Sequence, residues 1–275
     1  MITDLEVFDY FKQGLREDVL THPIIKHNKY LWWFSQTTDL DKEDLVYFTK
    51  QFSVFSNQFI VAQLLKTLNS NSLEQMRDAK EILVNELGVV FNSDNKVSAT
   101  GIDPEIVSVE GTVDGGTFRF KAAHFEWLLF FAKPLGLTFN DLGQRKHGDP
   151  ATLFFCDELI RIYGSDDFST AAGASFAVEN WANAGFWKQI IQGVEWYSKE
   201  TGTHLNLGFF KWHDALEAQH AQHTWDELED LFLNNKDFDQ EKFIKGALEM
   251  LDGVQAFWEG LDRYRITKYW RETRG

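Results

Sequence analysis

The sequence contains one cysteine, four prolines and no long run of apolar residues. A lone cysteine, Cys156, excludes an internal disulfide and fits a reducing compartment, so we expect a cytoplasmic protein. The apolar stretch 127–132 is far shorter than the roughly 20 residues that span a bilayer. The acidic N-terminal segment lacks the basic residues of a secretory signal. We therefore expect that the protein is neither inserted into a membrane nor secreted.

Basic residues are also few, since 27 Lys and Arg stand against 42 Asp and Glu, giving a formal net charge of −15. Binding to nucleic acid or to an anionic membrane depends on clustered Lys and Arg, so this balance argues against both partners. Most of the acids serve solubility, and a few are available to bind a metal. We therefore expect a small-molecule substrate as the main partner.

Aromatic residues are plentiful, with 25 Phe, 10 Trp and 7 Tyr, which allows a compact interior with a ring-lined cavity. Scarce proline and long stretches of 3.6-residue periodicity predict an all-α protein with one domain over residues 1–275. The expected helices are 4–20, 24–36, 41–68, 72–91, 119–137, 150–163, 167–200, 206–233 and 238–271.

Three of these helices have start signals. Asp41 is suited to be an N-cap, with acids following in the first turn, Pro150 suits a first helical position, and Asp237 can cap the helix that runs from Phe238. Between residues 92 and 118 the helical pattern stops. Segment 106–120 alternates around Asp114-Gly115-Gly116 and predicts a β-hairpin in an insertion, which is either a lid or a surface loop.

The strongest chemical signal is His213-x3-Glu217-x2-His220 on one predicted helix. At about 100° per residue, the three side chains fall within roughly 60° of one another. Two imidazoles and a carboxylate on one face suit iron, manganese or zinc. The alternative is a solvated surface stripe, but Phe209 and Trp212 beside it favour burial, and buried donors need a partner such as a metal.

Three further donors lie in apolar surroundings. Glu86 sits at the flank of the apolar face of its helix, His124 is embedded among rings, and Glu179 follows a stretch of its helix that is poor in charge. Alone, Glu86 would more often be an ordinary boundary residue and His124 an ordinary core histidine, whereas a glutamate at position 179 needs a partner. His223 is rotated about 60° off the stripe of His213, so we interpret it as an outer residue or a surface one.

The order of these residues resembles the haem-oxygenase-like diiron oxidases, a family that includes the chlamydial protein associating with death domains and the fatty-acid decarboxylase that forms 1-undecene. The resemblance covers nearly the whole chain. It begins at His22-Pro23 and continues through Asn85-Glu86-Leu87-Gly88, His124 with Leu135-Gly136-Leu137, Glu179, and the closing His213, Glu217 and His220. This chain differs in its long segment between Glu86 and His124 and in having Glu217 where aspartate is frequent.

The resemblance implies a haem-oxygenase-like bundle of seven to nine helices that binds two iron ions, Fe(II) or Fe(III), with dioxygen as co-substrate. Its implied ligands are Glu86, His124, Glu179, His213, Glu217 and His220, with one glutamate bridging the ions. The implied activity is oxidation of a small organic substrate such as an amino acid or a fatty acid. Manganese in place of iron, a homodimer and an external electron donor stay open.

Four alternatives differ in the residues that they need. A ferritin-like diiron protein needs two Glu-x-x-His pairs, and only Glu217 to His220 fits. A thiaminase needs a nucleophilic cysteine, for which only Cys156 is available. A haem oxygenase would use His22 or His27 and leave the six donors without a role. A non-enzymatic interaction protein of the same fold would bind no metal.

Overall fold

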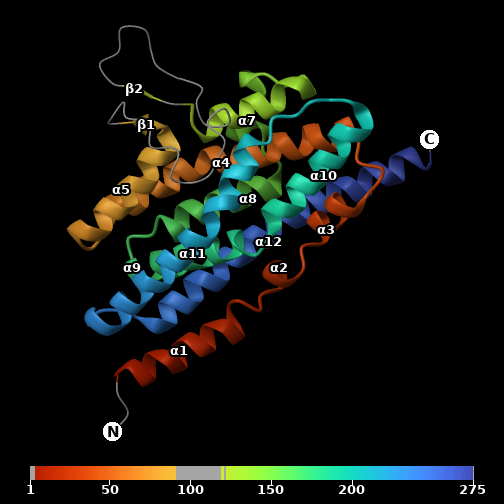
Figure 1. Ribbon diagram of the computed structural model, residues 1–275. Coiled ribbons are helices and arrows are strands. Elements are labelled where there is room, and N and C mark those ends of the chain that lie inside the picture. The colour runs from red at the N-terminus through yellow and green to blue at the C-terminus, as the bar shows by residue number, and fades with distance from the viewer. Residues whose placement is uncertain (1–3, 91–118, 121, 275) are drawn as a thin grey trace.

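The computed structural model describes residues 4–90, 119–120 and 122–274, and at 85, 89–90, 119–120 and 216–220 it describes the backbone alone. The described part is built of helices, as predicted, and none of them is long and apolar enough to cross a membrane. Eleven are α-helices, shown in Figure 1: α1 Asp4–Asp18, α2 Pro23–Lys26, α3 Lys29–Gln36, α4 Lys42–Leu68, α5 Leu73–Leu87, α7 His124–Ala132, α8 Pro150–Glu158, α9 Phe168–Ala182, α10 Phe186–Thr201, α11 Gly208–Asn234 and α12 Gln240–Glu272.

The helix count of the described part exceeds the expected seven to nine because two predicted helices are interrupted. The predicted helix 24–36 divides at His27–Asn28, where Asn28 Oδ1 accepts from the Leu31 amide at 3.1 Å and caps α3. The predicted helix 167–200 divides before Gly185, whose φ of +93° is left-handed. Both predictions of unbroken helices were wrong because the apolar periodicity continues across these short breaks.

The boundary of the inserted segment also differs from the prediction. Helix α7 begins at His124, not at 119, because Arg119–Phe120 form strand β2 and pair antiparallel with β1, Val89–Val90. Gly88, with a φ of +70°, ends α5 ahead of this pair. Residues 106–118 of the predicted hairpin lie outside the described residues.

Two of the three predicted start signals are confirmed. The third was wrong, because Asp239 and not Asp237 accepts from the first free amides of α12, which begins at Gln240. Asp41 caps α4 in a capping box with Asp44, and each side chain accepts from the other residue's backbone amide. Pro150 occupies the first turn of α8, which is capped by Asp149. These local contacts satisfy amides that the first helical turn otherwise leaves without a partner.

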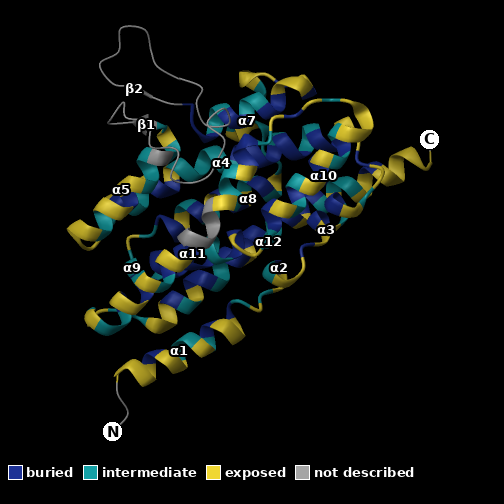
Figure 2. Ribbon diagram, viewed as in Figure 1, coloured by how far each residue is buried: buried dark blue, intermediate teal, exposed yellow. Residues whose placement is uncertain are grey.

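The centre of the bundle is held by a close crossing of α9 and α12. Both helices carry a glycine at the crossing, and a Cβ at Gly173 would lie 2.0 Å from the Phe243 carbonyl oxygen, while one at Gly246 would lie 2.5 Å from the Thr170 carbonyl oxygen. Both helices carry many buried residues, which Figure 2 colours dark blue. The position of α9 is therefore set by backbone contact, which side-chain rearrangement cannot relieve.

We expect Gly173→Ala to destabilise the protein by about 1 to 3 kcal/mol, because the added methyl forces two backbones apart. Gly14→Ala is the matched control, since nothing lies within 4 Å of its Cβ position in α1. The control should be neutral or stabilising by up to about 1 kcal/mol, the helix-propensity difference. Urea unfolding of both variants measures this, and equal stability of the two would contradict the close crossing.

Helix α5 has much less buried packing than α9. Among the described side chains of α5 only Ala79 is buried, and the helix packs on α4 at the edge of the bundle. Figure 2 shows its surface as mostly exposed or half-buried. Burial of apolar area is the main stabilising contribution to helix docking, so α5 is the more weakly held of the two.

Candidate metal centre

Four of the six predicted ligands line one cavity, and each comes from a different helix. Glu86 extends from α5, His124 from α7, Glu179 from α9 and His213 from α11. The cavity has a volume of about 120 Å³, and its other described walls are apolar or aromatic apart from Ser56. Helices that are far apart in the sequence thus bring two imidazoles and two carboxylates to one apolar space.

His124 and Glu86 form a direct pair. The Nδ1 atom of His124 lies 2.6 Å from Glu86 Oε2, and the side chains are only 7% and 11% exposed. With Nδ1 donating to the carboxylate, the lone pair of the neutral ring is on Nε2. A carboxylate that orients an imidazole in this way is common beside metal-bound histidine.

The other nitrogen of His124 provides a test of whether a metal fits. Nε2 is buried, and no hydrogen-bond partner for it exists among the described residues. Leaving a buried polar atom unpaired costs about 1 to 3 kcal/mol. A metal ion would remove this cost, since neutral imidazole nitrogen is a ligand for iron and manganese. The residues present therefore fit a metal at this position.

His213 is oriented by its own helix. Its Nδ1 donates to the Phe209 carbonyl oxygen at 2.7 Å, so the lone pair of the neutral ring is again on Nε2. The His213 and His124 ring centroids are 4.5 Å apart, and Trp187 stacks on His213 at 4.6 Å and 25°. Both histidines are thus held by surrounding groups before any ligand binds.

Glu179 is the second carboxylate of the cavity, and its surroundings change its titration. Burial raises the pKa of Glu179 to about 7, opposed by Lys66 and assisted by the charges of Glu86 and Glu227. Part of the side chain remains accessible, so burial is incomplete. A carboxylate that resists ionisation in the apo protein gains from a bound cation, which favours the charged form.

Sequence reasoning missed Lys66, a lysine that interacts electrostatically with Glu179 and Glu227. Lys66 Nζ donates to Ser175 Oγ at 2.7 Å and lies 5.2 Å from the centroid of the Tyr163 ring. Burial lowers its pKa, but Tyr163, Glu227 and Glu179 outweigh this and hold the pKa above its ordinary value. A lysine within a long apolar helix was the signal available in the sequence.

The raised pKa of Glu179 predicts a pH dependence for the metal-free protein. The native state binds more protons than the unfolded state between the ordinary value of 4.5 and about 7, so stability falls as pH rises through this window. Allowing for partial exposure, we expect a loss on the order of 1 to 2 kcal/mol. Glu179→Gln should lack this contribution, as measured by urea unfolding at pH 5 and 7.5. An identical slope in both proteins would contradict it.

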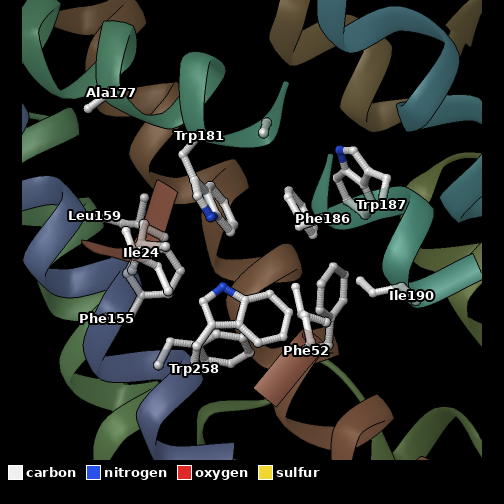
Figure 3. Close-up of a cluster of buried hydrophobic side chains, with 14 of the residues drawn as sticks. Ile24, Phe52, Phe155, Leu159, Ala177, Trp181, Phe186, Trp187, Ile190 and Trp258 are labelled. Carbon is white, nitrogen blue, oxygen red and sulfur yellow. The ribbon is translucent and has the colours of Figure 1, made fainter. Parts of the chain in front are cut away.

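A continuous aromatic wall closes the cavity on the α9–α10 side. Trp181 and Phe186 stack at 4.4 Å with an interplanar angle of 6°, and Phe186 and Trp187 lie 4.2 Å apart. Figure 3 shows these rings beside Phe52 and Trp258. The break between α9 and α10 thus turns three rings toward one cluster, and their bulk keeps water from the donor atoms.

Glu217 and His220 lie in α11, within the same helix as His213, but their side chains are outside the described residues. In the part of the chain that is described, no three His, Cys, Asp or Glu side chains form a group that could hold a metal ion. The four placed residues share a cavity without converging on one point. The six-ligand assignment stays a prediction.

Residues of the alternative interpretations lie elsewhere. Cys156 is fully buried in α8, and burial raises the pKa of its thiol to about 12, which does not suit a nucleophile. Neither His22 nor His27 is among the described residues that line the cavity. His223 is exposed, as expected for a surface residue.

No protein-family model matches the chain, and no curated protein matches it.

Several solved structures, in contrast, match the chain over nearly its whole length. A CADD-like protein of unknown function from Nostoc punctiforme superposes with a TM-score of 0.62 at 16% identity, covering 95% of this chain and 97% of that chain. A TenA homolog from Pseudomonas syringae pv. tomato gives 0.60 at 14% identity, covering 92% and 93%. A domain of unknown function with a heme oxygenase-like fold from Shewanella denitrificans gives 0.59 at 13%, covering 98% and 96%. The chain therefore has a haem-oxygenase-like fold, and the predicted fold class is confirmed.

Proposed function

We propose that this protein is a non-haem diiron oxidase that uses dioxygen to oxidise a small organic substrate. The observation that carries the proposal is the buried Nε2 of His124, which has no partner among the described residues, in a cavity shared with Glu86, Glu179 and His213. The motif order gives additional support, and so does the fold shared with a CADD-like protein.

The proposed ligands are Glu86, His124, Glu179, His213, Glu217 and His220. Two iron ions held by them would supply the binding and reduction of dioxygen, which organic side chains alone do not perform. Glu86 would have two roles, because it orients the ring of His124 through a hydrogen bond and would also bind a metal ion.

The protein's own contribution is orientation and exclusion of water. The Phe209 carbonyl holds the ring of His213, and Trp187 packs against its face. Rings that line the remaining walls keep bulk solvent away from the reacting atoms, which protects reactive species from side reactions. The open volume of about 120 Å³ leaves room for the reacting part of a substrate.

The test is metal content. Protein reconstituted with ferrous iron without oxygen should hold about two irons per chain, the number that six nitrogen and oxygen ligands serve while leaving open positions. Exposure to oxygen should then consume dioxygen and oxidise the iron, followed by elemental analysis and absorption spectroscopy. A single closed zinc site, or no metal at saturating iron, would refute the proposal.

A further inference from the structure

A second, larger depression adjoins the metal cavity. This acidic groove, of about 680 Å³, lies between α5 and α11, and Ile82 and Glu179 line both it and the cavity. An apolar compartment and a polar one therefore meet at the same carboxylate. A ligand that reaches the proposed metals from the groove would pass Glu179.

The groove is strongly negative. Apart from Glu179, six acids line it, and among the described lining residues Lys66 is the one lysine or arginine. Lys66 already donates to Ser175 Oγ and lies among Glu179 and Glu227, so its charge is compensated within the protein. Like charges raise the energy of a bound anion, whereas a cation gains from them. The acids are Glu74, Asp78, Glu81, Asp226, Glu227 and Asp230.

The cavity sets the size and polarity of the other end of the ligand. Its volume of about 120 Å³ is close to that of a cavity that admits benzene, roughly 150 Å³. Phe52, Phe59 and Trp212 are among its walls, so an apolar ring or a short branched chain is favoured there.

Resting on the proposed function, we propose that the substrate is an apolar amine: a ring or short hydrocarbon group that occupies the cavity, joined by a short chain to a cationic amino group that lies in the acidic groove. The unpartnered Nε2 of His124, in a residue that is only 6% exposed, lies in the wall of the cavity, so the proposed metal would lie beside the apolar group of the substrate. A fatty-acid carboxylate would face the acids of the groove and is disfavoured.

The test compares three probes that share a phenethyl group and differ in the charge of the terminal group: phenethylamine, 2-phenylethanol and 3-phenylpropionate. Their affinities are measured by calorimetry with iron-loaded protein under anaerobic conditions and with metal-free protein. At low salt the amine should bind at least about ten-fold more tightly than the carboxylate, with the alcohol between them, and the difference should shrink at high salt. Equal affinity for amine and carboxylate overturns the inference.

Two variants and one control variant separate the contribution of the acidic groove to binding from that of the cavity. Glu227→Gln should weaken phenethylamine several-fold and leave 2-phenylethanol unchanged, whereas the exposed Glu200→Gln in α10 should change neither. Ala182→Leu, which fills the cavity, should weaken both probes together. If Glu227→Gln slows iron uptake but leaves amine affinity unchanged, the groove serves metal entry and the amine inference fails. Failure to bind iron instead refutes the proposed function, because probe preference is measured separately.

Discussion

Replacing His213 by alanine should remove at least one of the two irons and abolish oxygen consumption, while most of the helical content is retained. The ring contributes a nitrogen oriented by the Phe209 carbonyl and lies 4.5 Å from the ring of His124. Metal binding depends on deprotonated, correctly oriented donors, and a lost ligand cannot be replaced by water without a large loss of affinity. Iron content after anaerobic reconstitution and circular dichroism measure both parts.

The matched control is His204→Ala. His204 is exposed and lies between α10 and α11, and such surface changes shift stability by about 0.5 kcal/mol or less. It should retain both irons. Equal iron loss in the two variants would contradict the assignment of His213, and full iron content in His213→Ala would contradict it as well.

Iron should slow amide hydrogen exchange in α5 more than in any other helix that carries a proposed ligand. With Ala79 as its one described buried side chain, α5 has little apolar packing to hold it, and exchange follows local opening. A bond from Glu86 to iron would link α5 to three other helices, so folding of this segment couples to metal binding. We expect at least about a hundred-fold slower exchange over 73–87, which corresponds to roughly 2.7 kcal/mol.

Helix α9 provides the internal comparison, because its crossing with α12 already fixes it. Its amides should be strongly protected with or without iron. Glu86→Gln tests the link itself, since the variant should lose most of the iron-induced protection of α5 while α9 is unaffected. Uniform protection of 73–87 in both states would refute the idea of a weakly held α5 and leave the metal site standing.

Most of the fold follows from local sequence signals. Periodicity and caps such as Asp41 and Pro150 predict the helices to within a few residues. The breaks at His27–Asn28 and before Gly185 escape prediction because apolar residues recur on both sides at helical spacing. The hairpin pattern predicts an extended Arg119–Phe120 but not the partner of this strand, because β1 lies before the long inserted segment and strand pairing over such distances leaves no local mark.

The candidate site, like the fold, could be predicted only in part from the sequence. Apolar neighbours in the sequence indicate that His124 and Glu179 are buried, and both line the cavity. The pairing of His124 with Glu86 joins residues that are 38 positions apart, so only the fold shows it. Lys66 and the acidic groove were missed for a similar reason, because solvated acids on separate helices look like ordinary surface residues until the helices are placed together.

The two glycines at the crossing of α9 and α12 also bear on the choice of metal. One wall of the site, which carries Glu179, is packed backbone against backbone on α12, whereas the wall that carries Glu86 has little buried packing and can adjust. A site of this kind accommodates ions of different radius by shifting one helix, so its geometry alone discriminates little between manganese and iron. We expect both ions to bind with similar stoichiometry when supplied separately, and the metal found in cells to follow the supply of each ion.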